Sequence, residues 1–155
     1  MERISKHISF DEATKSITAI RRGIFNKPGE VELANMKLVA EKCFEPLREW
    51  YGKPIKINSF YRSKALNTAV GGSSTSDHVK GMAIDLDAEH DNTKLFHYIR
   101  EKLDFDQLIA EFPINGIPSW IHVSYNQNNR KQVLVAKKIK GKTVYLSYEN
   151  EKDLI

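Results

Sequence analysis

The sequence has a single cysteine, Cys43, among its 155 residues. One cysteine cannot form an internal disulfide, which excludes the small secreted domains that disulfides hold together. It also excludes a cysteine-rich zinc finger, so any metal must bind to histidine and carboxylate side chains. Cys43 falls on the apolar face of a predicted helix. We therefore expect it to be a buried packing residue rather than a nucleophile.

Long apolar runs are also lacking. No stretch approaches the roughly 18 apolar residues of a membrane helix, and the N-terminal segment MERISKHISFDEATKS lacks the apolar centre of a signal peptide. We expect a chain that is made in the cytoplasm and has no membrane span. The sequence shows no repeat, no low-complexity tract and no linker, so residues 1–155 are predicted to form one domain. We expect the protein to be a monomer.

The excess of positive over negative charge is small. The chain has 24 lysine and arginine residues against 20 acidic residues, a formal net charge of +4. This excess is too small and too dispersed to indicate nucleic-acid binding, and we expect no nucleic-acid partner. It would equally suit an anionic polymer such as a bacterial cell wall.

Helical signals dominate the first half of the sequence. Ser9 and Glu12 form a capping-box pattern, which predicts a short helix from Ser9. Residues 18–30 contain glycine and proline and are predicted to be irregular. Residues 31–51 have apolar residues at helical spacing, including Trp50, with Pro46 as an expected kink. A further helix is predicted to start from a cap at Asn92 or Thr93 and to end near residue 103.

Strand patterns dominate the second half. They cover residues 54–60, 82–87, 107–112 and 120–125, and a hairpin of residues 133–137 and 143–148. Helices precede most of the strands, so we predict an α+β fold with an antiparallel sheet.

Two of the five histidines occur in unusual settings. His78 follows a loop rich in glycine and serine, and His122 lies between Ile121 and Val123 in a predicted strand. If the strands that carry Asp85 and His122 pair, both side chains project from one face, and His78 could complete a His/Asp/His group. Two imidazoles and one carboxylate leave one tetrahedral position open, as in catalytic zinc sites. The pattern also fits a surface histidine, a turn-stabilising aspartate and a hydrogen-bonded core histidine.

Several short motifs extend the pattern between residues 59 and 125, and they are as follows: Tyr61-Arg62-Ser63, Leu66-Asn67, Gly71-Gly72-Ser73, Ser76-Asp77-His78, Gly81-Met82-Ala83-Ile84-Asp85 and Trp120-Ile121-His122. In order and separation they resemble the family of zinc D-alanyl-D-alanine carboxypeptidases and L-alanyl-D-glutamate endopeptidases, which includes vancomycin-resistance peptidases and many phage endolysins. The resemblance is strongest to the phage-type branch. It implies a Hedgehog/D,D-peptidase-like fold.

The resemblance also implies roles for individual residues. Zinc would be held by His78, Asp85 and His122, and Arg62 would bind the scissile carbonyl or a substrate carboxylate, as a guanidinium is suited to do. Ser76 matches a substrate-binding serine, although it could equally bond its own loop. Strand alternation places Trp120 on the face of His122, where it could line the substrate cleft or join the core.

The general base is the position where this sequence departs from the family pattern. Many members have an acidic residue three positions before the last histidine ligand, and here that residue is Ser119. We predict that Glu111, in the sequence LIAEF, is the base. It could instead pair with a lysine or support a ligand histidine, and Asp87 is a second candidate for either task.

The resulting hypothesis is a zinc peptidase that cleaves peptidoglycan stem peptides at the bacterial cell wall. The resemblance to the phage-type branch is compatible with a phage-encoded enzyme. The alternative is a catalytically weak or inactive zinc-containing module that binds the cell wall or forms part of a virion. Ser119 keeps this alternative open. The sequence does not distinguish carboxypeptidase from endopeptidase action, or a lysis enzyme from a virion-associated one.

Overall fold

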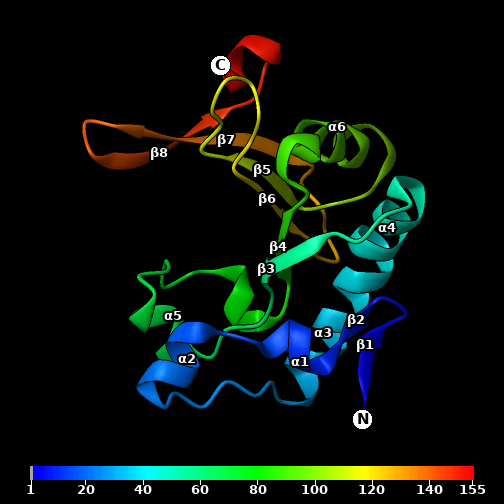
Figure 1. Ribbon diagram of the computed structural model, residues 1–155, viewed down its shortest axis with the longest axis vertical. Coiled ribbons are helices and arrows are strands. Elements are labelled where there is room, and N and C mark those ends of the chain that lie inside the picture. The colour runs from blue at the N-terminus through cyan, green and yellow to red at the C-terminus, as the bar shows by residue number, and fades with distance from the viewer. Residues whose placement is uncertain (1) are drawn as a thin grey trace.

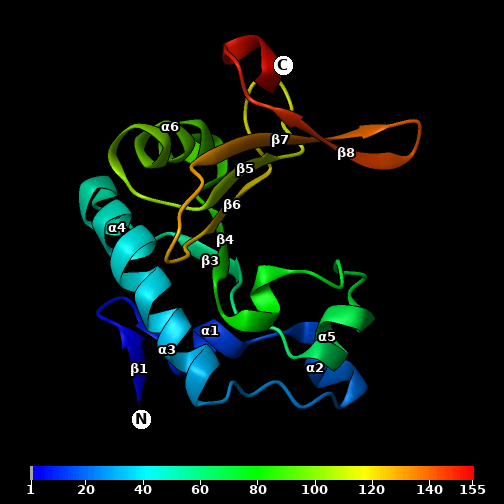
Figure 2. The same cartoon turned by 180° about the vertical axis from the view of Figure 1, so that it is seen from behind.

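A computed structural model describes residues 2–155 (Figures 1 and 2). Its centre is one six-stranded sheet with the strand order β3-β4-β6-β5-β7-β8. The strands are β3 (Lys56–Ser59), β4 (Ala83–Asp87), β5 (Gln107–Glu111), β6 (Trp120–Ser124), β7 (Gln132–Ile139) and β8 (Lys142–Ser147). A short hairpin of β1 (Arg3–Ser5) and β2 (Ile8–Ser9) precedes it. The α+β prediction is confirmed.

One pairing differs from the predicted antiparallel sheet. β5 and β7 run parallel, with Ile109 opposite Leu134, whereas the other neighbours in the sheet are antiparallel. The chain returns after β6 to the start of β5, where the amide of Gln132 donates to the carbonyl of Asp106 over 2.9 Å. The register of β7 on β5 begins from this bond. The predicted terminal hairpin is confirmed as β7–β8, which projects from the body on the side opposite α4 (Figure 1).

The helices are α1 (Phe10–Thr14), α2 (Ile17–Arg22), α3 (Glu30–Val39), α4 (Glu45–Tyr51), α5 (Lys64–Ala69) and α6 (Asn92–Lys102). A π-helical turn, η1 (Ala40–Phe44), joins α3 to α4, and three 3-10 turns follow: η2 (Asp77–Lys80), η3 (Glu89–Asp91) and η4 (Glu151–Leu154). Figure 1 shows α4 and α6 along one side of the sheet, and Figure 2 shows the same arrangement from behind.

The core lies between one face of the sheet and this helical layer. Alternate residues of the central strands face it, among them Ile84, Leu86, Ile121 and Val123, each fully buried. Residues from both ends of the chain, from Ile4 to Leu154, join the same apolar cluster. The opposite face of the strands is free for polar side chains.

The predicted long helix is continuous, but Pro46 changes its hydrogen bonding rather than simply kinking it. Proline lacks an N–H and its ring would press on the carbonyl four residues back. The π-helical turn lies directly before it, and the amide of Glu45 donates to the carbonyl of Ala40, five residues back. The helix ends at Gly52, whose φ is 74°, as the sequence predicts.

Three local predictions are wrong. Residues 17–22, placed mostly in an irregular segment, form α2, because the Ser16 side chain caps it and Gly23 ends it. Trp50 is 47% exposed and stacks on Tyr98 instead of facing the core. The side chains of Asn92 and Thr93 do not cap α6.

Asn92, one of the two residues predicted to cap α6, makes other hydrogen bonds instead. Asp91 occupies the N-cap position without a side-chain cap bond. The Asn92 side chain accepts from the amide of Ala88 at 2.6 Å and donates to the carbonyl of Pro118 at 2.9 Å. It therefore ties the start of α6 to the turn between β5 and β6.

Candidate metal centre

Two of the predicted ligands lie on neighbouring strands. In the antiparallel pairing of β4 with β6, Asp85 is directly opposite His122. Ile84 and Val123, the next pair, point into the core, so the pleat turns Asp85 and His122 to the open face. Directly opposite residues in such a pair have Cβ atoms about 5 Å apart. The register alone thus brings a carboxylate and an imidazole together.

His78 reaches the same place from η2, a short turn that leads into β4. The Ser76 side chain caps this turn by accepting from the amide of His78 at 3.3 Å. Gly81 ends it with a φ of 71°, and a Cβ there would lie 2.5 Å from the carbonyl oxygen of Glu32 on α3. Glycine is therefore required at this position both for the backbone angle and for the close approach of α3.

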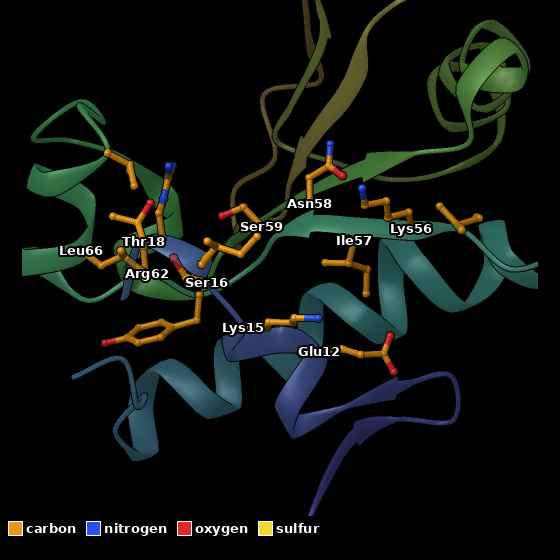
Figure 3. Close-up of a pocket in the computed structure, with 14 residues that line it drawn as sticks. Glu12, Lys15, Ser16, Thr18, Lys56, Ile57, Asn58, Ser59, Arg62 and Leu66 are labelled. Atoms are coloured by element: carbon orange, nitrogen blue, oxygen red, sulfur yellow. The ribbon is translucent and has the colours of Figure 1, made fainter. Parts of the chain in front are cut away.

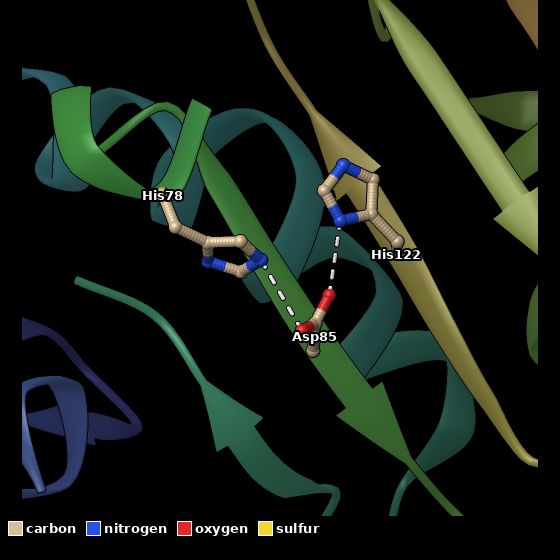
Figure 4. Close-up of side chains that lie close together, drawn as sticks. All are labelled: His78, Asp85 and His122. Carbon is tan, nitrogen blue, oxygen red and sulfur yellow. Dashed lines mark hydrogen bonds and ion pairs between the residues drawn. The ribbon is translucent and has the colours of Figure 1, made fainter. Parts of the chain in front are cut away.

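The three side chains form a compact group (Figure 4). His78 Nε2 lies 3.2 Å from Asp85 Oδ2, and His122 Nδ1 lies 3.0 Å from Asp85 Oδ1. One possible ligand atom from each residue lies within 4.8 Å of the other two, so the group could hold a metal ion. The His78 side chain is 2% exposed and that of His122 is 13% exposed.

The hydrogen bonding of His78 supports a cation at this point. Its Nδ1 lies 2.7 Å from the carbonyl oxygen of Phe60, and because a carbonyl only accepts, Nδ1 must carry a hydrogen. In the neutral ring Nε2 then presents a lone pair to the Asp85 carboxylate. Two lone pairs facing each other require a cation or an extra proton between them. A backbone carbonyl that fixes the tautomer is also the usual outer partner of a metal-bound histidine.

Electrostatics keep Asp85 ionised. Burial alone would raise its pKa, but the two histidines outweigh burial and hold the pKa of this carboxyl well below its usual range. Asp85 is therefore available as an anionic ligand. Histidine nitrogen and carboxylate oxygen suit zinc, and the donor set fits that ion.

Glu111 lies in the same pocket as the three candidate ligands, at the end of β5. It is opposite Trp120, two residues from His122 along β6, and on the same face of the sheet. The residue is 7% exposed, and its carboxylate makes no hydrogen bond to any residue between 2 and 155. Burial raises its pKa to about 7, with His122 lowering it and Asp85 raising it. A carboxylate that titrates near neutrality is suited to proton transfer.

Arg62 and Ser76 line the same pocket. Arg62 Nη2 donates to Ser76 Oγ over 3.3 Å, while Arg62 Nε is buried without a partner in the described part of the chain. Burial lowers the pKa of the guanidinium and Asp85 raises it. Most of the N–H groups of Arg62 therefore remain free for an anionic or carbonyl ligand.

Trp120 and Ser119 have different surroundings. Trp120 lines the pocket and its ring lies 5.4 Å from that of Phe112. Ser119 instead donates its hydroxyl to the carbonyl of Phe112 over 2.7 Å, which ties the turn between β5 and β6 together. The position for which the family resemblance predicted an acidic residue therefore has a serine that stabilises a turn.

Asp87 does not line the pocket, and its carboxylate is hydrogen-bonded elsewhere. One carboxylate oxygen of Asp87 accepts from the amide of Glu89 at 2.8 Å and from the side chain of Asn92 at 2.9 Å. It shares a strand with Asp85 but supports the turn that follows β4. The prediction for Cys43 is confirmed, because it is fully buried and burial raises the pKa of its thiol to about 12.

The remaining histidines lie away from the candidate metal centre. His90 is exposed, with its side chain 81% accessible. The side chain of His97 is 24% exposed, because its ring packs near Phe96 and its Nε2 lies 2.7 Å from Glu151 Oε1. His7 Nδ1 lies 2.6 Å from Glu45 Oε1, which fastens the β1–β2 hairpin to α4.

The pocket wall also contains residues that were not predicted from the sequence. Leu134 and Tyr145 line it from the terminal hairpin. The registers place Ala136 between Glu111 and Tyr145 on one face of the sheet, so Tyr145 approaches the pocket over a small side chain. Strand alternation could have placed Leu134 and Tyr145 on the pocket face only if the parallel pairing of β5 with β7 had been known.

Two imidazoles and a carboxylate that could hold a metal ion lie in an open pocket, and a buried glutamate and an arginine line the same pocket. Metal-dependent hydrolases use groups of these kinds. A comparison with family models agrees: the model described as Peptidase M15 matches residues 6–124. The chain belongs to this family, whose members are metallopeptidases. No curated protein matches the chain. Across residues 2–155, every helix is too short or too polar to cross a membrane.

Proposed function

We propose that the protein is a zinc-dependent peptidase that cleaves peptidoglycan stem peptides, by D-Ala-D-Ala carboxypeptidase or L-Ala-D-Glu endopeptidase action at the bacterial cell wall. The observation that carries the proposal is the convergence of His78, Asp85 and His122 with Glu111 and Arg62 in one pocket. Membership of the peptidase M15 family supports the peptidase activity. The stem peptide follows from the resemblance of the motifs between residues 59 and 125.

The candidate ligands supply two neutral nitrogens and one anionic oxygen, and zinc bound there would polarise the substrate carbonyl and lower the pKa of a water from ~15.7 to about 7. Glu111 takes the proton of the attacking water at its carboxylate and returns it to the nitrogen of the leaving amine. A pKa near 7 suits both halves of this transfer, since the group must accept and then release a proton.

Arg62 and Trp120 position the substrate. The guanidinium of Arg62 donates to the carbonyl oxygen as negative charge develops there, in a partly buried position where such charge is poorly solvated by water. Ser76 holds Arg62 in place and offers its hydroxyl to a substrate carboxylate. Trp120 provides an apolar surface against which a side chain of the peptide lies.

The experiment is digestion of purified muropeptides, followed by mass spectrometry of the products. The zinc-loaded protein is expected to release one defined fragment, whose mass identifies the cleaved bond. No cleavage by the protein with zinc bound would support the alternative of a zinc-containing module that binds the wall without hydrolysing it. Glu111 answers the main argument for that alternative, because it supplies an acid near the metal group although position 119 is a serine.

A further inference from the structure

A second pocket adjoins the first. Both have a volume of about 660 Å³, and both are lined by Arg62 and Val70. The second pocket lies between the α1–α2 segment and β3, and Figure 3 shows Lys15 and Ser16 below the space and Asn58 and Ser59 above it. Apart from Arg62, its lining residues have no part in the proposed hydrolysis.

The second pocket follows the edge of a strand. Five consecutive residues, 55–59, line it. Side chains of a strand alternate between the two faces of the sheet, so a pocket that touches five in succession must run along the edge. β3 is the first strand of the sheet, with β4 on one side only. Residues 55–59 make no backbone hydrogen bond to any element other than β4 in the described range 2–155.

The frame of this pocket is rigid at its Arg62 end. Asn26 donates to the carbonyl of Thr14 at 2.8 Å and to that of Tyr61 at 3.2 Å, and it accepts from the amide of Ser63 at 2.7 Å. The amide of Tyr61 also donates to the carbonyl of Ala13 at 3.0 Å. These bonds connect the end of α1 to the segment that carries Arg62 and set the width of the pocket at this end.

The charge of the pocket favours an anionic occupant. Lys15 and Lys56 are exposed along it and form no ion pair with any residue from 2 to 155, and Arg62 lies where the two pockets meet. Glu12 is the one acidic residue among the lining residues. Three cations against one carboxylate would attract an acidic chain at close range.

We propose that this pocket binds the part of the substrate that lies away from the cleaved bond. This part is an extended peptide with a free carboxylate, and its backbone pairs with the open edge of β3. The peptide then runs past Arg62 to the candidate metal ligands. The inference rests on the proposed function for the identity of the substrate. Backbone bonds to β3 supply affinity that depends little on side chains, and Lys15 and Lys56 select for acid. At about 3.3 Å per residue, the five-residue edge accommodates roughly four or five residues of peptide.

The test measures binding, so that it does not depend on cleavage. Zinc-loaded protein carrying Glu111→Gln is titrated with the dipeptide L-alanyl-D-glutamate and with a stem tetrapeptide that contains it. The tetrapeptide is expected to bind more tightly, and added Lys15→Glu or Lys56→Glu should weaken its binding by about 3–10-fold with little effect on the dipeptide. Amides of residues 55–59 that point away from β4 should gain protection from hydrogen exchange when the tetrapeptide binds.

Lys140→Glu is the matched control, since it makes the same change of charge on an exposed turn outside the pocket. An equal loss of affinity in all three charge variants, or protection confined to the metal pocket, would overturn the inference. If the wild type cleaves muropeptides but residues 55–59 gain no protection, the proposed peptidase activity stands and only the proposed subsite is wrong. If residues 55–59 gain protection but the wild type cleaves nothing, the proposed peptidase activity is wrong and the pocket is a peptide-binding groove.

Discussion

On β4, Ile84 and Leu86 point into the helical layer and are fully buried, whereas Asp85 between them faces the pocket. β6 repeats the contrast, with Ile121 and Val123 on the core side of His122. The two faces of these strands thus differ in chemistry although they share a backbone. Burial of apolar area stabilises the first face, while the second places ionisable groups close together at a cost in desolvation. A change on either face should therefore affect one property and spare the other.

The largest expected effect is loss of the metal from the open face. His122→Ala removes one of three candidate ligands, so zinc affinity should fall by more than the about 10–100-fold seen when an outer partner is lost, and hydrolysis should fall to background. Metal content by atomic emission and muropeptide cleavage measure the two. Removal of zinc with a chelator should have the same effect, reversed by added zinc. His90→Ala, at an exposed histidine, should change neither; equal losses in both variants would contradict the assignment.

Glu111→Gln should separate proton transfer from metal binding on the same face. We expect kcat to fall by about 10²–10⁴-fold while zinc content stays at the wild-type level. As base, Glu111 must be deprotonated, so wild-type kcat/KM should rise with pH through a value at or below about 7, because a bound cation lowers this pKa. That acidic limb should vanish in the variant. Glu49→Gln, at an exposed glutamate, serves as control, and full activity of Glu111→Gln would show that another group is the base.

Leu86→Ala tests the core face. Removing a fully buried side chain leaves a cavity, and the free energy of unfolding should fall by about 2–5 kcal/mol. Zinc stoichiometry of the protein that remains folded should not change. Urea denaturation measures the stability, and Leu146→Ala, at a leucine that is 42% exposed, should cost well under half as much. If Leu86→Ala lost zinc without losing stability, the separation of the two faces would be wrong.

The smallest effect concerns an ion pair at the rim of the sheet. Arg130 makes a two-pronged contact with the buried carboxylate of Asp106, at 3.0 and 2.9 Å, and holds the pKa of that carboxyl below its usual value. A carboxyl with a lowered folded pKa contributes stability above its unfolded pKa, near 4, and loses it as the pH falls. Arg130→Ala should lower stability by about 1 kcal/mol at pH 7 and by progressively less below pH 4, as followed by thermal melts. Lys131→Ala, which removes an exposed contact to Asp104, should have almost no effect.

Much of the open face follows from the sequence because strand alternation is local. Asp85 and His122 each sit between apolar residues, and the pleat then fixes their direction. The parallel register of β7 on β5 is not local, since it depends on where the chain after β6 returns to the sheet. Leu134 and Tyr145 were missed for that reason. α2 was missed because it has only six residues and ends at Gly23, and because its apolar residues Ile17 and Ile20 are exposed while only Ala19 is buried.

The phase of the strand pattern does not separate Asp87 from Asp85. Both lie on one face of β4, and the sequence made both candidates for chemistry. Strand periodicity assigns a side chain to a face but not to a position along it. Asp87 lies at the end of the strand, where the next turn offers the amide of Glu89 as a partner, and its carboxylate is used there.

The parallel pairing of β7 with β5 has a consequence for synthesis of the chain. Translation proceeds from the N-terminus, so β5 and β6 leave the ribosome before Gln132–Ile139 does. During that interval one edge of β5, with its apolar Leu108 and Ala110, has no partner and is a template for association with other chains. A product truncated after Ser124 would keep all three candidate ligands and still expose this edge. Loss of the hairpin would therefore appear first as aggregation of newly made protein rather than as a defect in metal chemistry.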